Sequence, residues 1–133
     1  MYKILVIDDD PNVRANIKSA LMQSDLKIEL HEAEDGQLGY DAAQKLEHVD
    51  FFIIDYNMPK LNGLQVVEKL LQIERFATKP IMLYTTETNP TLVMKARTMS
   101  KTIRWVIKPL NKEPFIQAVK GCLGLNVEHI YNA

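Results

Sequence analysis

Acidic, hydroxyl and basic side chains follow directly after the short apolar runs of this chain of 133 residues. They are Asp8, Asp9 and Asp10 after the first run, and Asp55, Thr85 with Thr86, and Lys108 after three later ones. Carboxylates that gather at one place repel one another and raise one another's pKa values unless a cation neutralises them. Oxygen-only ligands with few enclosing side chains suit Mg²⁺, which keeps several waters and also binds phosphate oxygens.

These residue types are the ones that aspartyl-phosphate chemistry requires. One carboxylate would act as the nucleophile and form an acyl phosphate. A divalent cation and the ammonium of Lys108 would offset the charge of the transferring phosphoryl group, and the hydroxyl of Thr85 would donate to it. Taken alone, an acidic run is commonly a solvated loop or a helix cap. An Asp at a strand end is commonly a turn former, Thr85 could be an ordinary strand residue, and Lys108 could be a solvated one. Their joint occurrence, each behind an apolar run, favours a site.

Five segments are predicted as the β-strands that position these side chains. Four are continuous apolar runs of three or four residues, which is too short for a buried helix and typical of strands covered on both faces. One segment alternates apolar and polar residues, which indicates an edge strand with one wet face. The four runs are Ile4–Ile7, Phe51–Ile54, Ile81–Tyr84 and Trp105–Ile107, and the alternating segment runs from Leu26 to His31.

Apolar residues at helical spacing predict five helices between and after these strands. The first lies behind Pro11, and the second carries a stripe of Leu38, Ala42 and Leu46. The others cover Leu64–Leu71, a segment from Asn89-Pro90 through Thr98, and a segment from Asn111 through Leu123, with Asn89 and Asn111 as candidate N-caps.

Alternating strands and helices predict an α/β protein with a doubly wound, five-stranded parallel sheet. Because the half-polar second strand belongs at an edge, we expect the flavodoxin-like order 2-1-3-4-5. Ligands of such sheets bind at the carboxyl ends of the strands, at the switch point between the first and third strands. This topology would bring Asp8, Asp9 and Asp55 together, with Thr85 and Lys108 beside them.

Composition narrows the class of protein. The chain is 47% hydrophobic and 25% charged, which predicts one packed domain. The net charge of −1 gives no electrostatic footprint for nucleic acid, and no apolar run is long enough for a membrane span. The start of the chain lacks the layout of a signal peptide, and Cys122 is the single cysteine. We therefore expect a cytoplasmic protein, with Cys122 in the core of its last helix.

Five motifs resemble those of a response-regulator receiver domain, the CheY-like module of two-component signalling. They are Ile4-Leu5-Val6-Ile7-Asp8-Asp9-Asp10, Phe51-Phe52-Ile53-Ile54-Asp55-Tyr56-Asn57-Met58-Pro59, Gly63, Tyr84-Thr85 and Val106-Ile107-Lys108-Pro109. The resemblance covers about Lys3 to Leu123. It implies that Asp55 is the phosphoacceptor of a phosphorelay and takes its phosphoryl group from a sensor histidine kinase or a phosphotransfer protein.

The same resemblance assigns a role to each remaining position of the site. Asp8 and Asp9 would hold Mg²⁺, with Asp9 and Asp55 as direct ligands and the backbone carbonyl of Asn57 as a further one. Lys108 would pair with the phosphate and precede Pro109 through a cis bond. Thr85 and Trp105 would be the switch hydroxyl and the switch aromatic residue.

The resemblance also implies the output and the limits of the domain. A downstream protein would bind the face made by the fourth helix, the fifth strand and the fifth helix. The only catalysis expected is Mg²⁺-dependent self-phosphorylation and self-dephosphorylation at Asp55. We expect the receiver domain to span residues 1–124 and a tail to span 125–133. The polar, basic stretch Arg97–Arg104 departs from the Gly-Ala common in the family before the fifth strand.

Two alternatives stay open at this point. Asp8-x-Asp10 after a hydrophobic strand also matches the nucleophile motif of haloacid-dehalogenase phosphatases, in which Asp8 would be the nucleophile. A binding module could also keep the receiver fold and act without phosphorylation. The intact acidic, Thr and Lys positions argue against that second alternative.

Overall fold

The computed structural model describes residues 1–125, in which five strands and five α-helices alternate. The strands are β1 (Tyr2–Ile7), β2 (Ile28–Ala33), β3 (Phe51–Ile54), β4 (Ile81–Thr85) and β5 (Ile103–Ile107). The helices are α1 (Pro11–Met22), α2 (Gly36–Lys45), α3 (Gly63–Leu71), α4 (Pro90–Met99) and α5 (Lys112–Cys122), with a short 3₁₀ helix at Glu74–Phe76. The predicted tail, apart from its first residue, lies outside the described residues.

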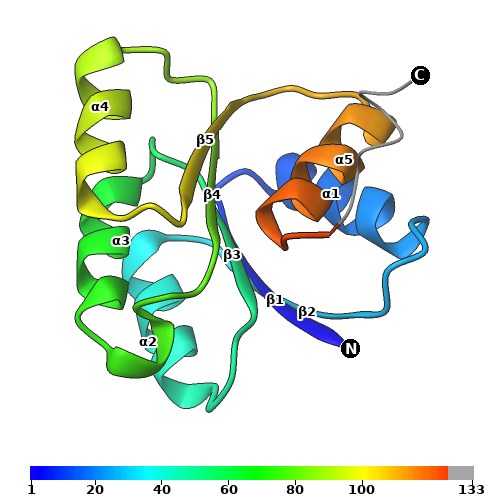
Figure 1. Cartoon of the computed structure of the whole chain (residues 1–133), viewed down its shortest axis with the longest axis horizontal. Coiled ribbons are helices and arrows are strands. Elements are labelled where there is room, and N and C mark those ends of the chain that lie inside the picture. The colour runs from blue at the N-terminus through cyan, green and yellow to red at the C-terminus, as the bar shows by residue number, and fades with distance from the viewer. Residues whose placement is uncertain (126–133) are drawn as a thin grey trace.

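The strands form one parallel sheet in the order β2-β1-β3-β4-β5, which confirms the predicted fold class and strand order. Figure 1 shows the sheet between two layers of helices, with α2, α3 and α4 on one face and α1 and α5 on the other. Successive residues of a strand point to opposite faces, so each central strand supplies both layers of the core. In β1, Leu5 and Ile7 pack toward α2 and α3, whereas Ile4 and Val6 pack toward α1 and α5.

The two edge strands differ from the three central strands in burial. Every residue of β3 and β4 is buried, as expected for continuous apolar runs between two helical layers. The predicted strand from Leu26 lies at an edge, as expected, but it begins at Ile28. The prediction that Trp105–Ile107 is covered on both faces is wrong. β5 pairs only with β4 and forms the other edge, so Ile107 remains 43% exposed.

The predicted apolar stripe of α2 is also wrong in part. Leu38 is 43% exposed, and the face that α2 buries carries Gly36, Gly39 and Ala43. A Cβ atom at Gly39 would overlap the side chain of Ile7, so the small residues allow the helix to approach β1 closely. Size complementarity, rather than hydrophobicity alone, therefore selects the buried face of α2.

Side-chain caps begin the helices that lead away from the carboxyl ends of the strands. Asp10 and Asn89 accept hydrogen bonds from the amides of Asn12 and Thr91, and a proline stands at the first position of both α1 and α4. These bonds satisfy amides that a helix leaves unpaired in its first turn. Asn111 precedes α5 as predicted, although its side chain makes no capping bond.

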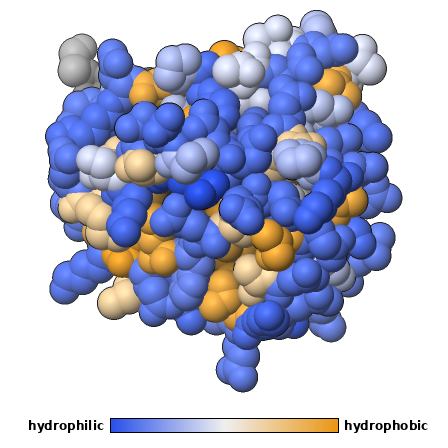
Figure 2. Space-filling view, turned by 180° about the vertical axis from the view of Figure 1, so that it is seen from behind, coloured by the Kyte–Doolittle hydropathy of each residue, from blue (hydrophilic) through white to orange (hydrophobic). Residues whose placement is uncertain are grey.

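Among residues 1–125, no helix is both long enough and apolar enough to cross a membrane. The face of the molecule seen from behind is mostly hydrophilic, and its hydrophobic side chains form small patches that are separated by hydrophilic ones (Figure 2).

Candidate functional site

The register of β1 and β3 places two aspartates side by side. Ile7 pairs with Ile54, so the next residue along each strand is an aspartate, Asp8 in one and Asp55 in the other. The amide of Asp55 donates to the carbonyl of Ile7 at 2.9 Å, and the amide of Asp8 donates to the carbonyl of Ala33 at 3.1 Å. The backbone therefore fixes both carboxyl groups at the same edge of the sheet.

Asp8, Asp9 and Asp55 form an acidic cluster at this edge, as the sequence predicted. Each offers a carboxylate oxygen, and these three oxygens lie within 4.8 Å of one another. Asp8 and Asp55 are only 2% and 6% exposed, whereas Asp9 is exposed to solvent. The cluster can hold a metal ion, and its open side is the exposed carboxylate of Asp9.

Lys108 supplies the cation that contacts this cluster. Its Nζ lies 3.0 Å from Oδ2 of Asp8 and 3.3 Å from Oδ2 of Asp55. Burial raises the pKa of Asp8 above its usual range, and the amide of Asp10 and the ammonium of Lys108 offset part of that effect. Burial by itself would lower the pKa of Lys108, but its bonds and charge interactions with Asp8 and Asp55 raise that pKa above the ordinary value.

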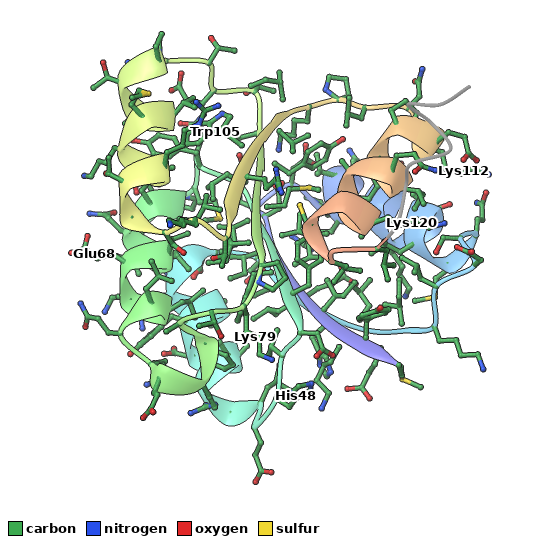
Figure 3. The ribbon with its side chains drawn as sticks, viewed as in Figure 1. His48, Glu68, Lys79, Trp105, Lys112 and Lys120 are labelled. Carbon is green, nitrogen blue, oxygen red and sulfur yellow. The ribbon has the colours of Figure 1, made fainter. Side chains whose placement is uncertain are left out.

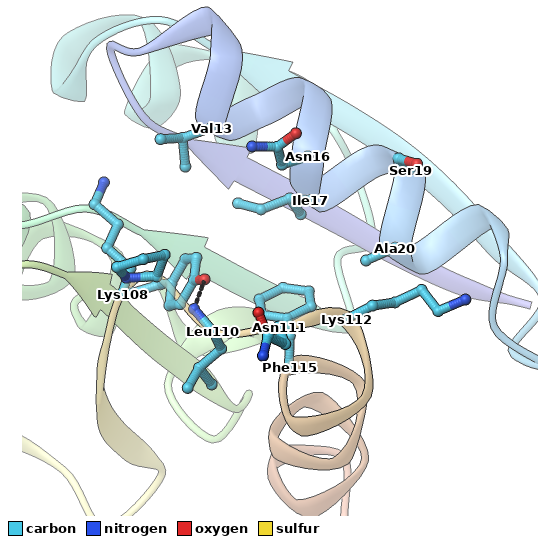
Figure 4. Close-up of a pocket in the computed structure, with 12 residues that line it drawn as sticks. Val13, Asn16, Ile17, Ser19, Ala20, Lys108, Leu110, Asn111, Lys112 and Phe115 are labelled. Atoms are coloured by element: carbon cyan, nitrogen blue, oxygen red, sulfur yellow. Dashed lines mark hydrogen bonds between the residues drawn. The ribbon is translucent and has the colours of Figure 1, made fainter.

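The end of β4 holds Lys108 in place through the backbone. The amide of Lys108 donates to the carbonyl of Thr85 at 3.0 Å, and the Lys108–Pro109 bond is cis, as the family resemblance implied. The next residue, Leu110, donates its amide to the hydroxyl of Tyr84 at 2.9 Å. Figure 4 shows this bond beside a cavity of about 340 Å³ that lies between α1 and the start of α5.

Thr85 is fully buried, and its hydroxyl already has a partner in the loop between β4 and α4. Its Oγ1 accepts from the amide of Glu87 at 3.2 Å. The carbonyl of Glu87 accepts from the indole Nε1 of Trp105 at 2.8 Å, and its carboxylate accepts from the amides of Thr88 and Asn89. Glu87 thus joins the two residues that the sequence predicted as a switch.

The indole of Trp105 is half-buried on the α4 side of β5 (Figure 3). Its ring centroid lies 6.0 Å from that of Tyr56, with the two planes tilted by 39°. Tyr56 directly follows Asp55, so one aromatic contact connects β5 with the loop that carries the buried aspartate. The sequence predicted a role for Trp105 but neither of these contacts.

Asn57 is adjacent to the cluster, although its side chain is exposed. Its amide lies 3.4 Å from Oδ1 of Asp55, which is a long hydrogen bond. A hollow of about 620 Å³ opens above Asp55 and Lys108, and Asp9, Thr86 and Pro109 also line it. Of the predicted site residues, Asp9, Asp55 and Lys108 therefore line one solvent-accessible space.

Arg14 contacts the backbone of Asp8, although the sequence predicted no role for it at the cluster. Arg14 lies one helical turn after Asp10 and donates from its guanidinium to the carbonyl of Asp8 and to the carboxylate of Glu32. The carboxylate of Asp10 caps α1 and stays out of the cluster. A phosphatase of the haloacid-dehalogenase type would need Asp10 beside its nucleophile, and here that side chain has a structural partner.

The donor set suits a hard divalent cation. Three carboxylates meet at one edge while a single ammonium contacts two of them, so negative charge is in excess. All donors are oxygen atoms, and the hollow leaves room for water and for phosphate oxygens. Asp55 is the buried carboxylate that both contacts Lys108 and lines the hollow, whereas Asp8 contacts Lys108 without lining it, and a phosphoryl acceptor requires access to that open space.

Several known proteins of similar length match nearly the whole chain. The family model of the response regulator receiver domain matches residues 4–120. A chemotaxis protein CheY homolog of Campylobacter jejuni is 31% identical over 122 residues, which is 92% of each chain. CheY1 of Helicobacter pylori is 31% identical over 93% of this chain and 98% of its own. The crystal structure of CheY4 of Vibrio cholerae has a TM-score of 0.81 and 29% identity, and the match covers 92% of this chain and 98% of that protein.

Proposed function

This chain belongs to the response regulator receiver domain family, the CheY-like modules of two-component signalling, and on that premise we propose that it is a phosphoacceptor that takes a phosphoryl group on Asp55. Receiver domains are signalling modules rather than enzymes that act on external substrates. The observation that carries the proposal is the buried carboxylate of Asp55, which lies 3.3 Å from Lys108 within the acidic cluster and faces an open hollow.

In the proposed transfer, a carboxylate oxygen of Asp55 attacks the phosphorus atom of a phosphohistidine. The new P–O bond forms as the P–N bond breaks, and the imidazole leaves with its electron pair. Lys108 stands where its ammonium can neutralise charge on the phosphoryl oxygens, and Thr85 can donate its hydroxyl proton to one of them. In the proposed dephosphorylation, which ends the signal, water attacks the same phosphorus atom, the carboxylate of Asp55 leaves, and inorganic phosphate is released.

Asp8, Asp9 and Asp55 would hold Mg²⁺ for this chemistry, and the backbone carbonyl of Asn57 would add a further ligand. The bound cation would neutralise the excess negative charge of the cluster and the charge of the incoming phosphoryl group. We infer that Asp8 acts indirectly, by positioning Lys108, because Asp8 is buried and its carboxylate lies 3.0 Å from the ammonium of Lys108.

The switch that we propose starts at the hydroxyl of Thr85. A phosphoryl group adds a charge of about −1.5 to −2 and new acceptor oxygens. A movement of the Thr85 hydroxyl toward them would lengthen or break the bond that it accepts from the amide of Glu87, whose carbonyl also binds Trp105. Phosphorylation would therefore bias the loop between β4 and α4, together with Trp105, between two arrangements.

The proposed partners are two kinds of protein, one that acts before the switch in signalling and one that acts after it. A sensor histidine kinase or a phosphotransfer protein would supply the phosphoryl group. A downstream protein would bind the face formed by α4, β5 and α5, which includes the strand that carries Trp105.

Intact mass spectrometry tests the proposal directly. The protein is incubated with Mg²⁺ and acetyl phosphate, beside Asp55→Asn and beside Asp25→Asn, a control that removes an exposed carboxylate far from the cluster. We expect one added phosphoryl group on the wild type and on Asp25→Asn, and none on Asp55→Asn. Chelation of Mg²⁺ with EDTA should abolish the addition.

Either of two results would contradict the proposal. Stoichiometric addition to Asp55→Asn would place the acceptor elsewhere. Failure of the wild type to take up phosphoryl, both from acetyl phosphate and from a phosphohistidine protein, would assign the fold to a module that acts without phosphorylation.

A further inference from the structure

The guanidinium of Arg14 joins three elements beside the acidic cluster. Arg14 lies in the first turn of α1, and its amide donates to the carbonyl of Asp10 at 3.1 Å. Its Nη1 donates to the backbone carbonyl of Asp8 at 2.6 Å, and its Nε donates to the carboxylate of Glu32 in β2 at 3.2 Å. A planar guanidinium can hold two such acceptors at once because its N–H donors form a rigid fork.

The carbonyl that Arg14 binds belongs to the peptide unit between Asp8 and Asp9. That unit is planar, so a bond to its carbonyl oxygen also fixes the direction of the Asp9 amide and the position of the Asp9 Cα atom. Before this unit, the amide of Asp8 donates to the carbonyl of Ala33 at 3.1 Å. After it, the amide of Asp10 donates to Oδ1 of Asp8 at 2.9 Å. Arg14 therefore supplies the bond that fixes the rotation of the peptide unit leading to Asp9.

Asp9 depends on its backbone more than the other two carboxylates of the cluster do. Asp8 and Asp55 are buried, and both contact the ammonium of Lys108. Asp9 is exposed, and its carboxylate forms no ion pair among residues 1–125. A side chain without such a contact can occupy several rotamers. The backbone of Asp9 must therefore keep its carboxylate within reach of the other two.

The surroundings of Arg14 indicate that its bond to the backbone is the more important of the two. The side chain of Arg14 is 17% exposed, whereas that of Glu32 is 36% exposed, and an ion pair at such an exposed carboxylate contributes little to stability. The bond to the carbonyl of Asp8 is shorter and charge-assisted, and bonds of that kind are about twice as strong as neutral ones. Glu32 thus orients the guanidinium, and Arg14 holds the backbone of Asp8.

We infer that Arg14 is a positioning residue for the Mg²⁺ site and acts through the backbone of Asp8, not as a ligand. Its bond would keep the carboxylate of Asp9 directed at the place where Asp8, Asp9 and Asp55 meet, so that the loop between β1 and α1 is already ordered when the cation binds. A loop that becomes ordered only on binding lowers affinity. The inference rests on the proposed function, because it concerns the Mg²⁺ site of that function.

Positioning and charge predict opposite results when Arg14 is replaced. Arg14 carries a positive charge, so electrostatics alone predicts that its removal strengthens the binding of a divalent cation. Loss of a positioning bond should weaken that binding. Arg14→Met retains an unbranched side chain but loses both hydrogen bonds. Arg14→Met/Glu32→Gln loses the same bonds without a change of net charge, because the ion pair that it replaces is neutral.

Nuclear magnetic resonance of the ¹⁵N-labelled full chain, titrated with MgCl₂ in the absence of a phosphoryl donor, measures the binding. We expect the dissociation constant for Mg²⁺ to rise about tenfold in Arg14→Met/Glu32→Gln and to rise also in Arg14→Met. The amide signal of Asp9 should be shifted in both variants before Mg²⁺ is added, because this amide shares the peptide unit whose carbonyl Arg14 binds. Unshifted signals of α4 and circular dichroism check that each variant is folded.

Arg75→Met is the matched control for the loss of an arginine. Arg75 also donates to backbone carbonyls, which belong to three residues around the end of α2, namely Ala43, Gln44 and Leu46. This segment leads to the start of β3, whereas the acidic cluster follows the last residues of β1 and β3. Arg75→Met changes the net charge as Arg14→Met does, and it should change the dissociation constant for Mg²⁺ by less than about twofold.

Phosphoryl uptake from acetyl phosphate gives a second measure of the same effect. In Arg14→Met/Glu32→Gln, the Mg²⁺ concentration that gives half of the maximal rate should rise about tenfold. The rate at saturating Mg²⁺ should stay within about twofold of the wild-type rate, because a residue that acts only through the metal site is compensated when that site is full.

Four outcomes would overturn the inference. The first two are a double variant that binds Mg²⁺ as tightly as the wild type and an Arg75→Met variant that loses as much affinity as the double variant. The third is a lower rate at saturating Mg²⁺ with unchanged affinity, which would assign Arg14 to the transfer step. The fourth is a wild type without saturable Mg²⁺ binding. A wild type whose Mg²⁺ binding depends on Arg14 but which takes up no phosphoryl would overturn only the proposed function.

Discussion

Helices α3 and α4 pack on the same face of the sheet but are anchored very differently. Five of the nine residues of α3 are buried, whereas only Ala96 is buried among the ten residues of α4. A capping box between Asn62 and Gln65 closes the start of α3 with two hydrogen bonds, and the side chain of Asn89 makes a single capping bond at the start of α4. Little buried area therefore resists a displacement of α4.

This difference fits the proposed function, in which Asp55 stays in place and the β4–α4 loop moves. The first residue of α3, Gly63, donates its amide to the carbonyl of Tyr56 and packs against the backbone of Asp55. The loop before α4 carries Glu87, whose bonds to Thr85 and Trp105 are individually easy to exchange. The anchored helix thus supports the proposed acceptor, and the loosely held one adjoins the proposed switch.

The largest loss of stability should come from truncating Leu70, the more deeply buried of the two buried leucines of α3. Leu70 is fully buried, so Leu70→Ala should lower the free energy of unfolding by about 2–5 kcal/mol. Leu92, on α4, is only half-buried, and Leu92→Ala should cost about 1 kcal/mol. Urea denaturation followed by circular dichroism measures both. Equal costs would show that α4 is anchored as firmly as α3.

Gly63→Ala should cause the next largest loss of stability, because Gly63 lies where α3 contacts the backbone of Asp55. A Cβ atom there would lie 2.5 Å from the carbonyl oxygen of Asp55, so helix and loop must shift, at a cost of about 1–3 kcal/mol. We also expect slower phosphoryl uptake from acetyl phosphate. The control is Gly121→Ala in α5, where the new methyl group meets nothing within 4 Å and should raise stability by up to about 1 kcal/mol. If Gly63→Ala were as stable as the wild type, the inference that α3 supports Asp55 through this close contact would be wrong.

Trp105→Phe should loosen the β4–α4 loop while α3 stays unaffected. The substitution keeps an aromatic ring but removes the indole N–H that binds the carbonyl of Glu87, at a cost of about 0.5–1.5 kcal/mol. Hydrogen–deuterium exchange should become faster in residues 86–90. Tyr84→Phe removes a comparable bond, to Leu110, and should leave exchange in that loop unchanged. Faster exchange in both variants would point to a general loss of stability instead.

The smallest change in stability should be a dependence on pH of the side-chain cap of α2, which is an aspartate, whereas the side-chain cap of α4 is the amide of Asn89. The amide of Leu38 and then the ammonium of Lys60 hold the pKa of the capping Asp35 below its usual range. The stabilisation that ionised Asp35 gives to the folded state is therefore complete above the unfolded pKa of about 3.9. It is lost as the pH falls through the lower pKa of the folded state. Asn89 caps α4 and does not titrate.

Hydrogen–deuterium exchange between pH 5 and pH 3, followed at the two amides that the caps bind, those of Leu38 in α2 and Thr91 in α4, checks this expectation. Protection at the start of α2 should decrease by a factor that corresponds to roughly a few tenths of a kcal/mol, and Asp35→Asn should remove the decrease. The prediction is wrong if Asp35→Asn and the wild type lose protection in parallel.

The sequence predicted the sheet and the cluster because both depend on local patterns. Apolar runs such as Phe51–Ile54 identify strands, and an aspartate directly after two of them must lie at a common edge once the strand order is known. The predicted neighbours Asp8, Asp9, Asp55 and Lys108 do lie together. Their chemical roles stay predictions until phosphoryl uptake is measured.

Other features depend on tertiary packing and could not be read from a pattern. The buried face of α2 follows from the space beside Ile7, which hydrophobicity at helical spacing does not encode. The bond from Trp105 to Glu87 joins a strand to a loop 18 residues earlier, and only the folded sheet brings them together. The left-handed backbone of Lys60, with φ of 70°, is similarly invisible in the sequence, since any residue type other than glycine is uncommon there.

The contact between Asp8 and Lys108 joins residues that are 100 positions apart in the chain. A ribosome that adds about 5–20 residues per second makes Asp8 roughly 5–20 s before it makes Lys108. During that interval the nascent chain carries the aspartates without their ammonium partner and without the last strand. The acidic cluster therefore gains its ammonium partner only once Lys108 has been synthesised, and a chain that stops before β5 would hold three carboxylates without that lysine.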